Sequence, residues 1–336
     1  MFKWPAPIAA LSLAVAVGLQ PTRGDSQEMD AIIALPAQTL TFSSAFIAED
    51  AGLYKKEGLK VSHRFLVGVA SPNAVIAGSA DFTIGTGPVF LRAAAQGQRM
   101  LAIANLLDKP LVEMVLRKDV ADAARITADM TVAERAKVLR GRTVGIQGVG
   151  SIVHAWERLV VNRAGLDVEK DVRIAPMDPP AMLPALENKA IDGYATSLPF
   201  TTQAVVKGSA VMLASAASDA PDLLPFAYGL VYARPDTCAK AREKCLRVVR
   251  ALAAANRFIL ERPNEAIEIL RKRFDKMDPA VLAAAWQTVS KAHASDIRVP
   301  VAGLENSQKV SLEAKLLGPN DSLKNFDGLH TEEFVR

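Results

Sequence analysis

The most constraining feature of this chain is a spacing of three residues that occurs twice, with the second copy 111 positions after the first. In each copy an Asp is followed by a Pro seven residues later and by a Gly nine residues after that Pro. The two sets are Asp81, Pro88 and Gly97, and Asp192, Pro199 and Gly208. Proline suits a first helical turn because it lacks an N–H, and glycine tolerates the positive φ that ends many helices. Each copy therefore predicts a strand after the Asp, a short loop, a helix that begins at the Pro, and a stop at the Gly.

A second pair of similar segments precedes these triplets, GLKV at 58–61 and GLDV at 165–168. Each one ends a helical stretch and opens a strand. Asp, Pro and Gly separate the elements of any α/β protein, so a single repeated triplet could arise by chance. Two motifs in the same order in both halves favour two similar α/β lobes. Two lobes predict a cleft between them, which is a common place for a small ligand to bind.

The length and the amino terminus indicate an exported protein with two domains. The chain has 336 residues, enough for two domains with separate cores, and its 50% hydrophobic and 23% charged residues are typical of soluble proteins. Residues 1–24 carry Lys3, and then a 13-residue apolar run at 7–19 that is too short to span a bilayer. This pattern predicts a cleaved signal peptide, with a mature periplasmic protein that begins between residues 17 and 26.

The charge balance argues against a nucleic-acid partner. The net charge is +4, and 38 basic and 36 acidic residues remain once residues 1–24 are removed. The densest basic stretch, residues 242–273, is interrupted by four glutamates. Such a mixed pattern is typical of a solvated helix surface and not of a phosphate-binding face.

Two cysteines, Cys238 and Cys245, are the only ones in the sequence. On one continuous helix their Cα atoms would lie about 10 Å apart, which is too far for a disulfide. Pro235-Asp236 indicates, however, that a helix begins close to Cys238, so the chain could fold back there. Because paired cysteines in exported proteins are usually bonded, we predict a structural disulfide. No cluster of His or Cys accompanies the pair, so we expect neither a metal site nor catalysis there.

Alternating strands and helices predict an α/β fold with two parallel-rich sheets flanked by helices. Residues 25–117 are assigned to the first part of lobe one and residues 118–226 to lobe two. Residues 227–336 are expected to complete lobe one, beginning with a return strand at 227–234 and continuing into C-terminal helices. The tail from about residue 295 shows no clear pattern.

Several segments resemble one known family. They are AEDAGLYKKEGLKV at 48–61, AGSADF at 77–82, LRGRTVGI at 139–146, AGL at 164–166 and AIDG at 190–193. Together they resemble the periplasmic substrate-binding proteins of ABC transporters, in the nitrate/sulfonate/taurine branch that also contains the thiamine-pyrimidine-synthase-like proteins. The resemblance covers roughly residues 30–275. It implies a bilobal type II periplasmic binding protein fold with a ligand cleft between the lobes.

The resemblance also implies the partners. We expect a solute-binding protein, monomeric and without a cofactor, that captures a small organic solute and delivers it to an ABC permease in the inner membrane. An extracytoplasmic sensor of the same fold stays open as an alternative, since its cleft would look the same. An enzyme is a weaker alternative. The yeast-type thiamine pyrimidine synthase carries a cysteine-rich iron-binding run, which a chain with only Cys238 and Cys245 lacks.

Four loops are candidates for the ligand site, because ligands of open α/β sheets bind beyond the carboxyl ends of the strands. Small residues let the backbone approach a ligand, hydroxyls add hydrogen-bond donors, and N–H groups at helix starts favour an anion. The candidate ligand-binding residues are Thr41, Phe42, Ser43, Ser44, Gly85, Thr86, Gly87, Gly148, Val149, Gly150, Ser151, Thr196, Ser197 and Tyr228. Helix capping is the alternative role for these loops. They contain no Arg or Lys, which argues against a multiply charged anion. We expect a small anionic solute, and aromatic acids, sulfonates and neutral heterocycles stay open.

Other site types fit the sequence poorly. Gly148-x-Gly150-x-x-Val153 lacks the third glycine of a dinucleotide fingerprint, and the next strand ends at Asp178, 30 residues after Gly148 rather than about 20. There is no Gly-x-Ser-x-Gly elbow for a nucleophilic serine. The four histidines show neither metal-ligand spacing nor an acidic partner. We therefore predict no catalytic residues and no metal.

Overall fold

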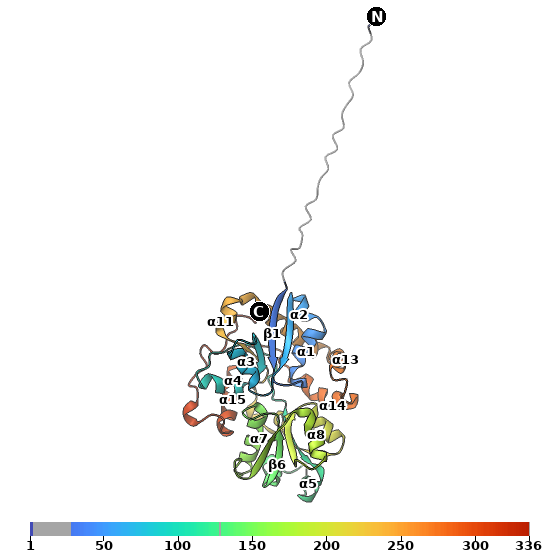
Figure 1. The fold of residues 1–336 in the computed structure, drawn as a ribbon, viewed down its shortest axis with the longest axis vertical. Helices are drawn as coiled ribbons and strands as arrows, with labels where there is room; N and C mark the ends of the chain where they lie inside the picture. Colours follow the sequence, from blue (N-terminus) through green and yellow to red (C-terminus); the bar gives the residue numbers. More distant parts are fainter. Residues whose placement is uncertain (3–27, 128, 336) are drawn as a thin grey trace.

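The computed structural model of the chain describes residues 1–2, 28–127 and 129–335. These residues form two five-stranded sheets, each flanked by helices, which lie one above the other in Figure 1. The two-lobed α/β architecture predicted from the sequence is confirmed. The predicted signal peptide falls almost wholly outside the described residues. Among those described, no helix is both long enough and apolar enough to cross a membrane.

Each sheet is parallel except for one strand. The first sheet has the order β2 (Leu59–Phe65), β1 (Met29–Leu35), β3 (Phe82–Gly85), β10 (Leu230–Ala233) and β4 (Leu101–Asn105). The second has the order β7 (Val172–Pro176), β6 (Arg142–Ile146), β8 (Gly193–Ser197), β5 (Val112–Arg117) and β9 (Ala210–Ser215). Both β10 and β5 run antiparallel to their two neighbours. The same strand position is therefore reversed in both lobes.

The position of β5 corrects the predicted lobe boundary at residue 117. Because β5 pairs with β8 and β9, the chain enters the second lobe between residues 105 and 112. Its apolar run is buried on both faces, so the sequence pattern alone does not identify the sheet to which it belongs. The predicted return strand is confirmed as β10, which follows the second crossing between the lobes.

Helices cover both sheets. Around the first sheet lie α1 (Ser43–Asp50), α2 (Leu53–Lys56), α3 (Ala70–Ile76), α4 (Gly87–Ala95), α11 (Pro235–Lys240), α12 (Arg242–Glu261) and α13 (Pro263–Arg273). Around the second lie α5 (Lys118–Ala123), α6 (Val132–Ala136), α7 (Ile152–Arg163), α8 (Pro179–Glu187), α9 (Phe200–Val206) and α10 (Ala216–Asp219). The helix α14 (Pro279–Val289) packs against α9 although it follows the return strand. Short 3-10 turns lie at Leu40–Phe42, Lys137–Leu139, Pro221–Leu223, Ser290–Ala292 and Pro319–Asp321.

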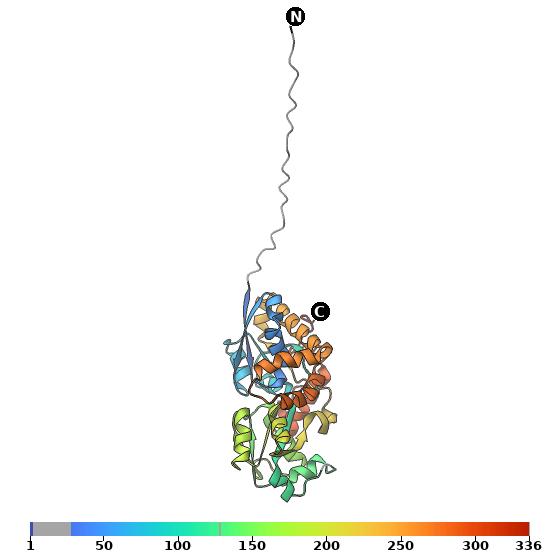
Figure 2. The same cartoon turned by 90° about the vertical axis from the view of Figure 1, so that its right-hand side faces the viewer.

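The tail, in which the sequence showed no clear pattern, contains the helix α15 (Val301–Glu313). This helix packs against α4 of the first lobe and α7 of the second, and it lies beside the junction of the lobes in Figures 1 and 2. On α7, Arg158 Nε and Asn162 Nδ2 donate hydrogen bonds to the carbonyls of Ala314 and Glu313 at the end of α15. The C-terminal segment therefore contacts both lobes.

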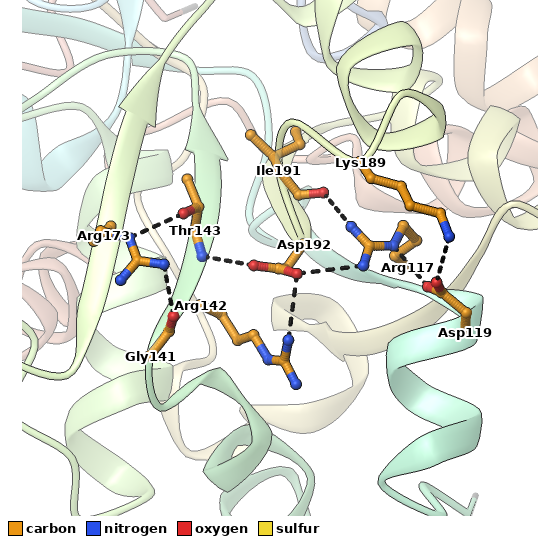
Figure 3. A network of polar contacts seen from close by, with 9 residues as sticks. All are labelled: Arg117, Asp119, Gly141, Arg142, Thr143, Arg173, Lys189, Ile191 and Asp192. Carbon is orange, nitrogen blue, oxygen red and sulfur yellow. Dashed lines mark hydrogen bonds and ion pairs between the residues drawn. The ribbon is translucent and has the colours of Figure 1, made fainter.

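The repeated Asp has the same structural role in each lobe. Asp81 Oδ2 accepts a 2.8 Å hydrogen bond from the Ile32 N–H on β1, and Asp192 Oδ2 accepts one of 3.0 Å from the Thr143 N–H on β6. The two donors are themselves 111 positions apart. Figure 3 shows Asp192 between Thr143 and the guanidinium groups of Arg117 and Arg142. In both lobes the carboxylate ties the beginning of one strand to the neighbouring strand.

The Gly and Pro of the repeated spacing also lie close to their predicted positions. Gly97 has φ 78° and Gly208 has φ 74°, so both end their helices in the left-handed conformation, as predicted. Pro88 lies in the first turn of α4, as expected. The second helix differs, because α9 begins at Phe200, one residue after Pro199.

We predict that Asp192→Ala destabilises the protein by about 1–3 kcal/mol, because the Thr143 N–H then loses its side-chain acceptor. Urea unfolding measures this change. Asp119→Ala is the control, since the Asp119 carboxylate also pairs with Arg117 but is half exposed and accepts no strand N–H. Equal losses in the two variants would contradict the assigned role of Asp192.

Cys238 and Cys245 form a disulfide, as predicted. The helix breaks at Ala241, between α11 and α12, which brings the two Cα atoms to 5.7 Å. The bond therefore joins two consecutive helices and not two turns of one helix.

We predict that the exported protein has no free thiol in denaturant unless a reductant is added, as a thiol titration would measure. The double substitution Cys238→Ser/Cys245→Ser should lower the free energy of unfolding by about 2 kcal/mol, the loop-closure entropy of so short a loop. Two reactive thiols per untreated chain would contradict the pairing.

Candidate functional site

A cavity of about 50 Å³ lies where the two lobes meet. It is near the carboxyl ends of the parallel strands, with Gly85 ending β3 and Ser197 ending β8. This volume is enough for a few water molecules or a compact polar group. The cavity is lined by Pro36, Thr39, Thr41, Phe42, Gly68, Pro72, Gly85, Thr86, Val89, Gln147, Ser151, Ile152, Val153, Ser197, Tyr228 and Tyr232.

Half of the predicted ligand-binding residues lie in this lining, and every predicted loop contributes to it. They are Thr41, Phe42, Gly85, Thr86, Ser151, Ser197 and Tyr228. Residues from both lobes thus meet around one space, as the repeated strand–loop–helix units led us to expect.

Four of the other predicted residues are buried outside the lining. Ser43 Oγ donates to the Leu40 carbonyl, and Ser44 Oγ donates to Asn256 Oδ1. Gly87 packs against α15, where an added Cβ would lie 2.2 Å from Ser307 Oγ. Thr196 precedes Ser197 on β8, so its side chain points to the opposite face of the sheet.

The glycine loop at 148–150 borders the cavity without lining it. Gly148 faces Gly68 of the first lobe, because an added Cβ would lie 3.7 Å from the Gly68 Cα. The Val149 side chain is 57% exposed and points to solvent. Gly150 has φ 79°, and an added Cβ would lie 2.4 Å from Arg92 Nη1 of α4. The loop therefore contacts the first lobe at the edge of the cavity.

Nine lining residues were not predicted from the sequence. They are Pro36, Thr39, Gly68, Pro72, Val89, Gln147, Ile152, Val153 and Tyr232. Tyr232 could have been found, since it lies four residues after Tyr228 and alternate residues of a strand share one face. Gln147 directly precedes the predicted glycine loop. Pro36 and Gly68 have no comparable local signal.

Direct hydrogen bonds join the lobes around the cavity. The Leu40 N–H donates to the Leu198 carbonyl at 3.1 Å, and Gln147 Nε2 donates to the Pro36 carbonyl at 3.2 Å. The structure therefore has its lobes in contact over the cavity.

Two helices, one from each lobe, begin at the cavity. Thr86 is the residue before α4 and Ser151 the residue before α7, and both line the cavity. Ser151 Oγ accepts a hydrogen bond from the His154 N–H, so Ser151 caps its helix as well as lining the cavity, whereas Thr86 makes no such bond. Helix starts carry the positive end of the helix dipole, which favours a negatively charged or electron-rich ligand atom.

The polar groups of the lining are neutral. Among the described residues that line the cavity there is no Asp, Glu, Lys, Arg or His. Burial raises the pKa of Tyr228 to about 12, so its hydroxyl keeps its proton. Throughout the described segments, no group of three or more His, Cys, Asp or Glu residues is placed to hold a metal ion. Hydroxyls, one amide and the two helix starts therefore supply the polarity of the site.

His154 holds the glycine loop. Its Nδ1 accepts a 3.0 Å hydrogen bond from the Gly150 N–H, which requires an unprotonated Nδ1. Burial, with a contribution from the nearby Arg158, lowers the pKa of His154 from 6.5 to about 4. The imidazole is therefore neutral at pH 7 and supports the loop as an acceptor.

We predict that protonation of His154 destabilises the protein. The pKa is lower in the folded chain than in the unfolded chain, so the contribution is complete above about pH 6.5 and is lost as the pH falls toward 4. His154→Asn keeps an acceptor but does not titrate. Between these pH values the unchanged protein should lose about 2 kcal/mol more unfolding free energy than the variant, as measured by urea unfolding. Burial also lowers the pKa of His293 to about 4, and His293 is present in both proteins. Parallel pH curves would contradict the role of His154.

Comparisons with known proteins identify one family by sequence and one fold by structure. The NMT1-like family matches residues 37–272. No curated protein sequence matches the chain.

Three solved structures illustrate the similarity of fold. A protein from Bordetella bronchiseptica RB50 has a TM-score of 0.77 and 21% identity, over 91% of this chain and 95% of that one. The alkanesulfonate-binding protein SsuA from Xanthomonas axonopodis pv. citri, bound to MOPS, has a TM-score of 0.69 and 17% identity, over 87% of this chain and 96% of that one. The nitrate-binding protein NrtA from Synechocystis PCC 6803 has a TM-score of 0.65 and 14% identity, over 91% of this chain and 87% of that one. The chain thus has the two-lobed fold of periplasmic binding proteins.

Proposed function

The chain belongs to the NMT1-like family, and from this premise we propose that it is the solute-binding protein of an ABC import system. It is exported to the periplasm, captures a small, singly charged organic anion between its lobes, and delivers it to a permease in the inner membrane. The short apolar run at the amino terminus supports export. The fold shared with alkanesulfonate- and nitrate-binding proteins supports the role in uptake.

The observation that carries the proposal is the cavity between the lobes, at which one helix of each lobe begins. The helix starts and the surrounding hydroxyls favour an electron-rich head group. A second negative charge would carry a large desolvation penalty there, because the lining contains no cationic side chain among the described residues. A single sulfonate or carboxylate fits these conditions best.

Capture requires that the solute bind the closed lobes better than the open ones. A solute that contacts Thr86 and Ser151 at once bridges the two lobes, since these residues lie on opposite sides of the junction. The function proposed is binding without catalysis. Both cysteines are held in the disulfide between α11 and α12, and neither lines the cavity.

Thermal unfolding of the purified chain from residue 25 onward tests the proposal. The probes are the organic anions ethanesulfonate and benzoate, the inorganic anion nitrate, and taurine, a sulfonate whose ammonium group makes it a zwitterion. A ligand that binds only the folded protein at 100 times its Kd stabilises it by about 2.7 kcal/mol, so the midpoint should rise with probe concentration. An unchanged midpoint with all four probes would contradict the proposed solute class.

We predict that Gly150→Val weakens binding of the best probe. A valine would be strained at a φ of 79°, and it would displace the guanidinium group of Arg92 on the opposite lobe, so the loop would contact the first lobe less closely. Calorimetry measures the affinity. Ser290→Ala, in the 3-10 turn after α14, is the control and should bind normally. Normal binding by the folded Gly150→Val protein would place the site elsewhere.

A further inference from the structure

Three hydroxyl groups in the cavity have no hydrogen-bond partner among the described residues: Thr41 Oγ1, Thr86 Oγ1 and Tyr232 OH. The three residues are 5%, 8% and 0% exposed. A buried polar group without a partner is rare in native proteins and destabilises the state in which it occurs. Three of them line one small cavity, where each is free to donate a hydrogen bond to a bound ligand.

All three belong to the first lobe. Thr41 lies in the turn before α1, Thr86 precedes α4, and Tyr232 is on β10. They therefore come from segments far apart in the sequence that the first sheet brings to one wall of the cavity.

The polar side chains that the second lobe contributes are already bonded. Ser151 Oγ donates to the Gly148 carbonyl at 2.7 Å and accepts from the His154 N–H. Ser197 Oγ lies 3.4 Å from the Tyr228 hydroxyl, and Gln147 Nε2 donates to the Pro36 carbonyl. The two lobes thus differ in their capacity for new hydrogen bonds.

The Phe90 ring and the space beside Gly85 accommodate the Tyr232 side chain. The Tyr232 ring packs on Phe90 of α4, with the ring centroids 5.1 Å apart. A Cβ added to Gly85 would lie 2.6 Å from the hydroxyl oxygen. Gly85 therefore leaves the space that the hydroxyl occupies, and a larger residue there would displace it. This explains a glycine at the end of β3 that has no positive φ.

We propose that Thr41, Thr86 and Tyr232 bind the polar head group of the solute. The head group is a sulfonate or carboxylate whose oxygens accept the three hydroxyl protons. The solute seats on the first lobe, and the second lobe closes over it and adds its helix start. This inference rests on the proposed function and names the residues that select the solute.

The first test needs no solute. Thr86→Val and Tyr232→Phe each remove an unpaired hydroxyl with little change of shape, so each should raise the unfolding midpoint by about 1–3 °C. Ser151→Ala removes two bonds already made and should lower it. If Thr86→Val and Tyr232→Phe instead lower the midpoint as Ser151→Ala does, the hydroxyls are structural and the proposal is overturned.

The second test measures affinity for the best binder among nitrate, ethanesulfonate, taurine and benzoate. Thr86→Val and Tyr232→Phe should each weaken binding at least about tenfold, the loss of one charge-assisted hydrogen bond. Thr237→Val is the matched control. Thr237 is a buried threonine on α11, its hydroxyl also lacks a partner among the described residues, and it lies outside the cavity lining. The Thr237→Val protein should bind the probe as tightly as the unchanged protein does.

The two proposals fail in different ways. If the unchanged protein binds a probe and the Thr86 and Tyr232 variants bind it equally well, the head-group assignment is wrong and solute binding stands. If no probe binds the unchanged protein, the solute class is wrong. The solute-free midpoints then still decide whether the three hydroxyls are unpaired.

Discussion

The hydrogen bond from a strand N–H to a repeated aspartate is the constraint on which the site depends. Asp81 holds the Ile32 N–H and Asp192 holds the Thr143 N–H, so each fixes the offset between two adjacent parallel strands. With that offset fixed, the strands of a pair end at the same edge of their sheet, and the loops that follow open on one cavity. Cations lie beside both carboxylates, with Lys244 paired to Asp81 in the first lobe and two arginines paired to Asp192 in the second. Each aspartate lies at the opposite end of its strand from the cavity loop that it helps to position.

The two reversed strands connect the lobes mechanically. Both β5 and β10 directly follow a crossing of the chain, and each then takes the equivalent place in the other sheet. The segment before β10 carries Tyr228, and β10 itself carries Tyr232, so movement at this crossing acts directly on the cavity wall. The helix α15 adds a third link, since side chains of α7 bond the carbonyls at its end. Relative motion of the lobes must therefore accommodate two crossings and one helix contact.

Much of the fold could be predicted from the sequence, because its signals are local. The repeated Asp–Pro–Gly spacing located two strand–loop–helix units, and the return strand predicted at 227–234 is β10. The features that could not be predicted are those that depend on tertiary structure. The apolar run of β5 fits either sheet, and α15 is recognisable only once α4 and α7 are in place. Within the site, Ser43, Ser44 and Thr196 were predicted by residue type. Ser43 and Ser44 bond to other partners, and Thr196 lies on the face of β8 opposite to Ser197. Tyr232 was missed although Tyr228 was found.

Unpaired hydroxyls link the chemistry of the cavity to its closure. With the lobes apart, water can hydrate Thr41, Thr86 and Tyr232, whereas the closed arrangement leaves them without partners among the described residues. Each unsatisfied group destabilises the closed empty state by about 1–3 kcal/mol, so three amount to several kcal/mol. To move a two-state equilibrium from about 1:99 to 99:1, a ligand needs a preference of about 5.5 kcal/mol for one state. A solute that satisfies all three hydroxyls supplies a preference of that order. On the proposed assignment, the groups that recognise the solute are therefore also the ones that destabilise the empty closed protein.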